Sequence, residues 1–480
     1  MYQPTIGLEV HAELKTKTKM FCGCVNNPDE KRPNFNVCQV CLGHPGALPF
    51  ANKKAIEAVL KAGIALNSRI PERSKFDRKN YFYPDLPKGY QISQYDEPLC
   101  SGGYLDIFEN RRIKLTRIHL EEDTGRLIHS NDGKSSLVDF NRAGLPLMEL
   151  VTEPDIKNGK EAVAFAKEFQ LILKYLGISD ADMEKGHMRV EANISVSKDE
   201  NLGTKVEIKN LNSFRAVEES IDYEIKRQKE ILETGNKVTQ ETRGWDENKK
   251  STFPQRKKEE AHDYRYFPEP DLPPLDIKGF RTDELKMEIP ELPEKKRGRF
   301  LREYNLSREQ SEVLISDLFL ADYFEEAVSE LKSESPDADC QLLFNYLTSD
   351  LKGLMNESNL KVTGIKITPE NFADLITMII KGEILSKTAK EILKEMMLTG
   401  DDPRNIIKEK ELGKIFDNDI IKETAVSVLK DNIKAVEDYK KGKDNVMQFL
   451  IGQAMAKLKG RGDPEKLKNI FRELINYGRN

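Results

Sequence analysis

The 480-residue sequence predicts an α+β domain built on a large, mostly antiparallel sheet, followed by an all-α region. Four separate stretches in the first half alternate apolar and polar residues with a period of two, as half-buried strands do. Only some of these stretches are separated by segments whose apolar residues have helical spacing. The sequence therefore lacks the regular strand–helix alternation that is typical of a parallel sheet. Beyond Arg297 the periodic stretches have helical spacing.

The first of the four predicted strands shows the alternation most clearly. Between Ile6 and Leu14, five apolar residues face one way, and Glu9, His11 and Glu13 face the other way. The same plan recurs in residues 118–123, 188–196 and 204–211.

If these strands share one sheet, its polar face collects acidic side chains. Like charges close together raise one another's pKa, so such a cluster favours a bound cation. Carboxylate oxygens are ligands of Mg²⁺, which usually arrives with nucleotide phosphates. A solvated strand face explains one such strand, but four repeats favour a metal site. The residues on this face are Glu9, His11, Glu121 or Glu122, Glu191 and Glu207.

Length and composition limit the class of protein. A chain of 480 residues is too long for one core, so two or three domains are expected. No apolar run approaches the ~20 residues of a membrane helix, and no secretory signal opens the chain, which favours a cytoplasmic protein. The net charge of −5 does not suggest a nucleic-acid binder. However, residues 451–480 hold seven Lys/Arg against three Asp/Glu, which indicates either a phosphate-facing patch or a solvated helix face.

Four of the six cysteines are close together, as Cys22-x-Cys24 and Cys38-x-x-Cys41. In a cytosolic chain this pattern favours a structural Zn²⁺ site, because four thiolates close the coordination sphere. The first pair is one residue shorter than the usual spacing. A reduced, partly buried thiol cluster is the alternative.

Residues 76–94 combine cations and aromatic rings with two prolines and a glycine, which predicts a loop. Cations beside rings suit phosphate and ring-stacking contacts, and a surface loop with packed tyrosines is the alternative. The sequence contains no glycine-rich phosphate loop of the Walker or dinucleotide type, so a nucleotide would be held in another way.

Cap and turn residues delimit the other elements. Asp132-Gly133 predicts a hairpin turn, and Asn52 predicts the start of a helix that runs to about residue 66. Two further helices are expected, one ending at Gly177 and one running from an Asn212 cap to Gly235. Prolines mark a connector between residues 268 and 293, and helices follow, one of them stopped by Gly400 and the last begun by Asp463-Pro464. The predicted domains are 1–292 (α+β), 293–405 (helical) and 406–480 (a small helical tail).

Several of these stretches resemble the B subunit of the glutamine-dependent aspartyl/glutamyl-tRNA amidotransferases, the GatB family. The match is dense from residue 5 to about 275, and Gly452-Gln453 and Lys459–Pro464 resemble the last helices of the family. The archaeal E-type relative, which acts on Glu-tRNA(Gln) alone, has an inserted domain for which this chain has no room. The stretches that carry the resemblance are Ile6–His11, Arg78–Gln94, His119–Asp123, Asp139–Pro146, Lys205–Ser213 and Glu259–Asp271.

The resemblance implies a glutamine synthetase-like core that uses ATP and Mg²⁺. Such a subunit phosphorylates the side-chain carboxylate of a misacylated Asp-tRNA(Asn) or Glu-tRNA(Gln), and ammonia then displaces the phosphate to give the amide. An amidase subunit (A) would release the ammonia from glutamine and pass it through an internal tunnel, and a small subunit (C) would complete a heterotrimer. The helical tail would bind the tRNA.

The resemblance also implies roles for individual residues. Strand alternation places Glu121 and Glu122 on opposite faces, so a bulge or one bystander acid is required. Two stretches depart from the usual family pattern, Met188-Arg189-Val190-Glu191 and Pro254-Gln255-Arg256, but neither removes a proposed ligand. The implied catalytic residues are Glu9, His11, Glu122, Glu207 and Lys79; the residues for ATP or the tRNA 3′ end are Lys88, Tyr81, Tyr90, Arg189, Lys205 and Lys209; and the Mg²⁺ ligands are Glu9, His11, Glu121, Glu122, Glu191 and Glu207.

Two other functions stay open at this point. A non-catalytic tRNA-binding scaffold would keep the helical tail but have gaps in the acidic set. A stand-alone ATP-dependent ligase acting on a free amino acid would need no tRNA. The sequence does not decide between Asp-tRNA(Asn) and Glu-tRNA(Gln) as the substrate.

Overall fold

The computed structural model describes residues 2–108, 111–130, 132–198, 201–257, 264–410, 418–443, 445–458 and 461–477. The chain divides into two compact units, Met1–Pro293 and Glu294–Asn480. The first unit contains all the strands that are described, and the second unit is helical. Parts of two stretches that carry the family resemblance, residues 259–263 and 459–460, lie outside the described residues.

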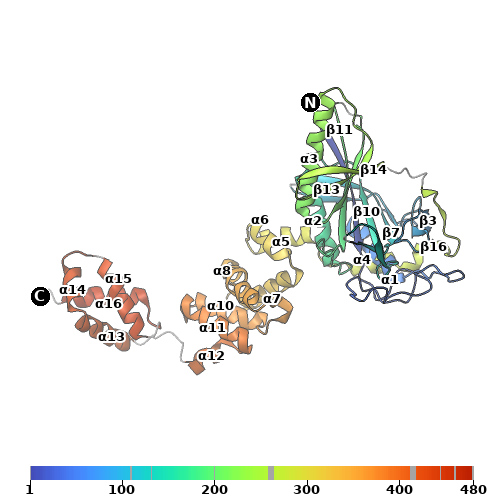
Figure 1. The fold of residues 1–480 in the computed structure, drawn as a ribbon. Coiled ribbons are helices and arrows are strands. Elements are labelled where there is room, and N and C mark those ends of the chain that lie inside the picture. Colours follow the sequence, from blue (N-terminus) through green and yellow to red (C-terminus); the bar gives the residue numbers. More distant parts are fainter. Residues whose placement is uncertain are drawn as a thin grey trace. The chain divides into compact units, whose positions relative to one another are not determined.

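A nine-stranded sheet forms the centre of the first unit (Figure 1). Its order is β14-β13-β12-β11-β1-β10-β7-β5, with β6 also paired to β7, and all pairs are antiparallel except β12–β13. The four strands expected from alternation are β1, β7, β11 and β12, and they share this sheet as predicted. The strands are β1 (Gln3–Glu13), β5 (Cys100–Ser101), β6 (Tyr104–Ile107), β7 (Arg111–Glu122), β10 (Pro146–Thr152), β11 (Met188–Ser197), β12 (Val206–Leu211), β13 (Glu241–Asp246) and β14 (Ser251–Lys257).

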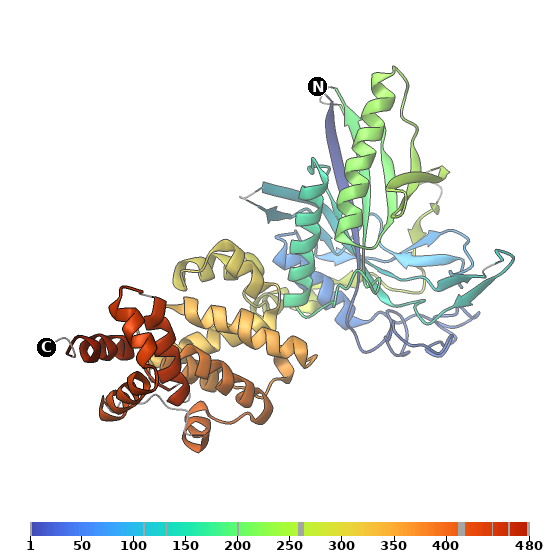
Figure 2. The ribbon, with the colours of Figure 1, turned by 60° about the vertical axis from the view of Figure 1, so that its left-hand side comes forward.

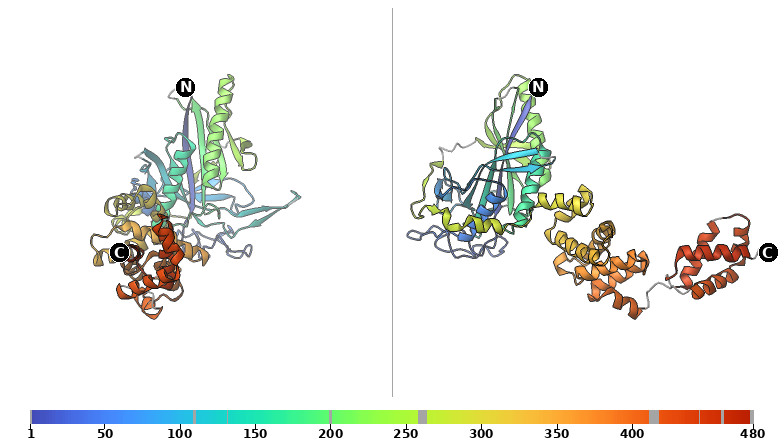
Figure 3. Two further views of the ribbon diagram at one scale, coloured as in Figure 1. Left: turned by 90° about the vertical axis from the view of Figure 1, so that its left-hand side faces the viewer. Right: turned by 180° about the vertical axis from the view of Figure 1, so that it is seen from behind.

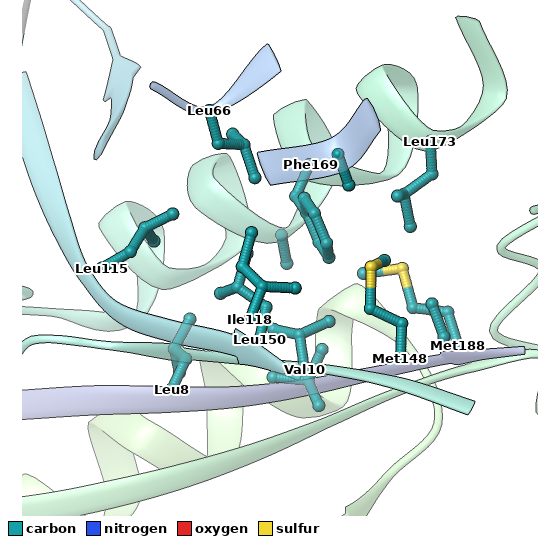
Figure 4. Close-up of a cluster of buried hydrophobic side chains, with 14 of the residues drawn as sticks. Leu8, Val10, Leu66, Leu115, Ile118, Met148, Leu150, Phe169, Leu173 and Met188 are labelled. Carbon is teal, nitrogen blue, oxygen red and sulfur yellow. The ribbon is translucent and has the colours of Figure 1, made fainter. Parts of the chain in front are cut away.

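Three helices cover the apolar face of the sheet: α1 (Lys53–Ala65), α2 (Gly159–Tyr175) and α3 (Phe214–Glu233). Helices α2 and α3 lie side by side along it (Figures 2 and 3). Figure 4 shows the core between the sheet and the helices, where Val10, Ile118 and Leu150 of three strands meet Phe169 and Leu173 of α2. The residues between these apolar positions therefore face the other side of the sheet.

The structure confirms most of the predicted caps. The side chain of Asn52 accepts hydrogen bonds from the backbone N–H groups of Lys54 and Ala55 at the start of α1. The predicted Asn212 cap of α3 is wrong by one residue, because the Ser213 hydroxyl accepts the bond from the N–H of Ala216. The Asp132-Gly133 turn joins β8 (Arg126–His129) to β9 (Ser136–Asp139).

The predicted loop at residues 76–94 is partly a hairpin. Strands β3 (Asp77–Asn80) and β4 (Tyr90–Ser93) pair with each other, and β3 also pairs with β15 (Phe267–Pro268). The two prolines and Gly89, which has a positive φ of 73°, lie in the connection between the strands. The prolines and the glycine therefore indicated the connection in the middle of this segment but not the strands on either side of it. A further short pair joins β2 (Arg73–Ser74) to β16 (Leu275–Asp276).

The second unit is built around two hydrophobic clusters, one formed by residues between Phe300 and Ile406 and the other by residues between Ile421 and Ile475. Gly400 ends α11 with a φ of 82°, as predicted. The boundary between the two helical domains stays a prediction. Between η2 (Ile277–Phe280) and the C-terminus the helices are α4 (Thr282–Met287), α5 (Pro293–Glu303), α6 (Arg308–Ile315), α7 (Leu318–Glu334), α8 (Cys340–Asn345), η3 (Tyr346–Leu351), α9 (Lys352–Glu357), η4 (Val362–Gly364), α10 (Pro369–Ile380), α11 (Ser386–Thr399), α12 (Pro403–Lys410), α13 (Asn418–Asp431), α14 (Ile433–Lys440), α15 (Asn445–Lys457) and α16 (Pro464–Tyr477). In the described part of the chain, none of the helices has the length and apolarity needed to cross a bilayer.

Candidate active site and cysteine cluster

Neighbouring strands place a first group of side chains that could bind a metal ion on the polar face of the sheet. His11 of β1, Glu121 of β7 and Glu149 of β10 can bring one ligand atom each to within 4.8 Å of the others. The sheet register explains this proximity, because Glu149 lies directly opposite both His11 and His119 on its two neighbouring strands. A carboxylate oxygen of Glu149 is 3.3 Å from Nε2 of His11 and 3.2 Å from Nε2 of His119. We call His11, Glu121 and Glu149 the His11 group.

The charges of the His11 group depend on one another. Burial acts against ionisation of Glu149, but His119 and His11 hold the pKa of this carboxyl well below its ordinary value. Loss of hydration lowers the pKa of His11, and the carboxylates of Glu149, Glu191 and Glu121 outweigh it and raise that pKa to about 9. Glu149 is thus the counter-ion of two histidines.

A second group, the Glu9 group, consists of Glu9, Glu191 and Glu207 from β1, β11 and β12. Glu9 lies directly opposite Glu191 in the sheet. The amide of Asn193 donates a 2.8 Å hydrogen bond to Glu9, and Nζ of Lys209 lies 2.7 Å from Glu191 and 3.6 Å from Glu207. Desolvation and then the charges of Glu149, Glu191 and Glu207 raise the pKa of Glu9. Glu9 therefore feels the carboxylates of both groups.

The β3–β4 hairpin supplies cations and rings to the same polar face. The hydroxyl of Ser93 donates a 3.0 Å hydrogen bond to Glu121. Burial disfavours the charge on Lys79, yet the carboxylates of Glu121 and Glu149 hold the pKa of this lysine well above its ordinary value. Its ammonium group is 5.0 Å from the ring centroid of Tyr264, and Tyr81 packs edge-on against the same ring.

Glu122 does not join either acidic group. It forms an ion pair with Lys88 and accepts a 2.9 Å hydrogen bond from the backbone N–H of Ile92. Strand alternation separates the two neighbours: Glu121 belongs to the His11 group, and Glu122 contacts Lys88 and the backbone of β4. The Arg78 guanidinium lies 4.3 Å from the ring centroid of Tyr90, so one face of this ring is already covered.

Two other predicted site residues lie next to the acidic groups along the strands: Arg189 is directly opposite His11 in the sheet, and Lys205 is two residues before Glu207. Arg189 donates a 3.0 Å hydrogen bond to Asp123, which also binds Arg142. These two guanidinium groups outweigh burial and hold the pKa of Asp123 below its ordinary value. Burial and the charge of Asp123 raise the pKa of Glu13 to about 8, despite the same two arginines. Lys205 is exposed, immediately before β12.

The four clustered cysteines converge as predicted. The sulfur atoms of Cys22, Cys24, Cys38 and Cys41 all lie within 4.8 Å of one another. The backbone N–H of Cys38 donates a 3.1 Å hydrogen bond to the sulfur of Cys41. A hydrogen bond from Cys22, followed by the charge of Lys19, lowers the pKa of the Cys41 thiol to about 5 against the effect of burial. This donor set fits a tetrahedral Zn²⁺ site.

Comparisons with known proteins identify the family. A family model described as "GatB/GatE catalytic domain" matches residues 4–282, and one described as "GatB domain" matches residues 322–475. A protein of Thermoanaerobacter sp. (strain X514), named as the B subunit of aspartyl/glutamyl-tRNA(Asn/Gln) amidotransferase, is 47% identical over 99% of both chains. The chain belongs to the GatB family. Proteins with the same name from Persephonella marina and Thermotoga petrophila are 46% and 45% identical, again over 99% of both chains.

Sequence reasoning missed two residues of this candidate site, Glu149 and His119. Strand β10 was not predicted, because Pro146–Thr152 is a nearly continuous apolar run without alternation. The single carboxylate within that run was the available signal, since a lone acid in a buried strand needs a partner. His119 was visible in the alternating run before Glu121 but was not assigned a role.

We expect the metal-free GatB chain to lose thermal stability as the pH rises from about 6.5 to about 9. The pKa of His11 is about 9 in the fold against an ordinary 6.5, so its stabilising contribution is complete below pH 6.5 and is lost as the pH passes through 9. Glu13 acts in the same direction, because its raised pKa of about 8 favours the protonated carboxyl. Melting temperatures measured in a chelator across this range would test the sign.

Added Mg²⁺ should restore more stability at pH 9 than at pH 6.5, because a metal ion competes with the proton on His11. A melting temperature that rises with pH in the chelator would contradict the assigned charges.

We also expect about one zinc per chain in the purified protein, measured by elemental analysis. Removal of the metal should lower the melting temperature, because the cluster closes a loop that is otherwise rich in turns and bends. Zinc-free protein with an unchanged melting temperature would instead support the reduced thiol cluster.

Proposed function

We propose that this GatB family member carries out the ATP-dependent amidation of Asp-tRNA(Asn), Glu-tRNA(Gln) or both. The observation that carries the proposal is the convergence of the His11 group and the Glu9 group on one polar face, beneath the Lys79 hairpin. Phosphoryl transfer requires charge neutralisation and alignment more than a covalent catalyst, and this arrangement can supply both.

The reaction has two balanced steps. A side-chain carboxylate oxygen of the tRNA-bound aspartate or glutamate attacks the γ-phosphorus of ATP, and ADP leaves as the bond to its bridging oxygen breaks. Ammonia then attacks the carbonyl carbon of the acyl phosphate, inorganic phosphate leaves, and the ammonia nitrogen loses a proton to give the amide.

The side chains divide this work. The two groups, with six ligand residues in total, would hold Mg²⁺, which when bound neutralises and aligns the ATP phosphates. Lys79 lies close enough to Glu121 and Glu149 to add positive charge where the transferred phosphoryl group accumulates negative charge. The amide of Asn193 fixes the orientation of Glu9.

Glu122 was expected to be a metal ligand, and its ion pair with Lys88 argues for a different task. We assign both residues to the wall of the site beside the hairpin. Lys88, Tyr81 and Tyr90 keep their proposed role near ATP or the tRNA 3′ end. Lys209 would balance the charge of Glu191 and Glu207 until the metal arrives.

The proposal includes partners and a location. An amidase subunit would release ammonia from glutamine, a small third subunit would complete the heterotrimer, and the helical unit would contact the tRNA. A structural Zn²⁺ would sit in the cysteine cluster, and the complex would be cytoplasmic. All the predicted Mg²⁺ ligands except Glu122 belong to the two groups, which argues against a non-catalytic scaffold.

The test is ATP consumption by the reconstituted complex with and without misacylated Glu-tRNA(Gln) and Asp-tRNA(Asn). We expect ADP formation to depend on one or both of these tRNAs and to match the amide formed. Consumption that is unaffected by tRNA would favour a ligase for a free amino acid. A folded complex that consumes no ATP would favour the scaffold.

A further inference from the structure

Lys19 is a completely buried lysine at the edge of the cysteine cluster. Its ammonium group donates hydrogen bonds to the backbone oxygens of Ala143 at 2.7 Å and Phe140 at 3.2 Å, and it lies 3.8 Å from the sulfur of Cys41. A buried charge without a counter-charge is strongly unfavourable. The two carbonyl groups are neutral, so the contact that can supply a negative charge is the sulfur of Cys41, which is a thiolate when it binds a metal.

The segment that carries Lys19 also fixes the cysteine loop. The backbone N–H of Lys19 donates to the carbonyl of Cys24 at 2.9 Å, and the N–H of Met20 donates to the carbonyl of Gly144 at 2.8 Å. The lysine thus contacts the cluster on one side and the turn at residues 140–144 on the other side.

That turn lies against the proposed active site. The backbone of Gly144 donates to the carbonyl of Asp123, which follows Glu122 at the end of β7. A Cβ atom added to Gly144 would meet Cβ of Cys41 at 3.4 Å and a carboxylate oxygen of Glu122 at 3.8 Å. On the cluster side, a Cβ atom on Gly43 would overlap the side chain of Lys88. Gly144 therefore lies between Cys41 and Glu122, and Gly43, two residues after Cys41, lies against Lys88.

We propose that Lys19 is a positioning residue, the buried counter-charge that fastens the metal-loaded cysteine cluster to the turn beside Glu122. Zn²⁺ bound by four thiolates carries a net charge of −2, so an ammonium ion in contact with one sulfur stabilises the loaded form more than the protonated, metal-free form. Binding of zinc to the cluster would thereby also stabilise the position of Glu122 and Lys88 in the wall of the site. This inference rests on the zinc proposed above.

The experiment compares the full-length chain with its Lys19→Met variant, which keeps the length of the side chain and removes its charge. Zinc affinity is measured by competition with a chromogenic chelator, and we expect a ~10–100-fold loss in the variant. Melting temperatures are measured in zinc-loaded and zinc-stripped forms, and Lys19→Met should lower that of the loaded form more. Lys17→Met, which changes an exposed lysine two residues away, is the matched control and should leave both readouts unchanged.

The Lys19→Arg variant separates charge from packing, and it keeps the test decisive if the methionine variant does not fold. It should retain zinc affinity to within a few-fold, even where its larger group lowers the melting temperature. An arginine variant that loses zinc as the methionine variant does, or a methionine variant with equal losses of stability in both forms, would overturn the inference. A wild-type chain that binds no zinc would remove the zinc site itself, and the inference with it.

Discussion

Replacing Glu149 by glutamine should lower the rate of tRNA-dependent amidation by on the order of 10³-fold, while glutamine hydrolysis by the partner subunit stays measurable. Glu149 belongs to the His11 group, and its carboxylate is within 3.3 Å of both His11 and His119. The substitution preserves size but removes the charge that a metal ligand needs. The measurement is amide formation by the reconstituted complex at saturating ATP and Mg²⁺.

The same substitution should reduce the stability of the metal-free chain. Buried His119 and partly buried His11 lose their shared counter-ion, and removal of one partner of a buried ion pair costs about 3 kcal/mol. Part of this cost disappears when the histidines release their protons, so the loss should be larger at pH 6 than at pH 9. Melting temperatures at the two pH values would show the difference.

Glu233→Gln provides the control for both measurements. Glu233 is exposed at the last residue of α3, so this variant makes the same chemical change far from the polar face. Its rate and melting temperature should match those of the wild-type chain. If the Glu149 variant also kept a wild-type rate, the His11 group would have no part in catalysis.

The contrast between Glu149 and the predicted ligands shows what strand patterns can reveal. Alternation predicted β1, β7, β11 and β12, because one face of each meets water or ligand while the other meets the core. It did not reveal β10, which lies between β1 and β7 in the sheet. Local patterns could predict the acidic residues of β1, β7, β11 and β12. They could not predict Glu149, because its contacts with His11 and His119 depend on which strands become neighbours in the sheet.

The same limit applies to the hairpin that covers the site. Proline and glycine report the local backbone correctly, and they do form the connection between β3 and β4. The pairing of β3 with β15 joins residues nearly 200 positions apart, as Arg78 and Phe267 show. The residues of β3 and its neighbours in sequence do not reveal which distant strand pairs with it. The stability of a strand nevertheless depends strongly on that pairing. Tyr264, which meets Lys79, could not be assigned for this reason.

The Glu9→Gln variant should likewise lose amidation by on the order of 10³-fold, but its effect on stability should have the opposite sign. Desolvation and the charges of Glu149, Glu191 and Glu207 all raise the pKa of Glu9, so its ionised form is held in the fold against repulsion. A neutral amide relieves that repulsion. We therefore expect a higher melting temperature for the metal-free variant than for the wild-type chain at pH 8.

Added Mg²⁺ should reverse this order of melting temperatures. The wild-type chain binds the ion with the Glu9 carboxylate, which the variant lacks, so the ion stabilises the wild-type chain more. The decisive comparison is the Mg²⁺-dependent rise in melting temperature, which should be smaller in Glu9→Gln than in wild type. An undiminished rise with lost activity would place Glu9 on the substrate rather than on the metal. A lower melting temperature for the metal-free variant would contradict this prediction. It would show that the Glu9 carboxylate stabilises the fold and does not destabilise it by repulsion.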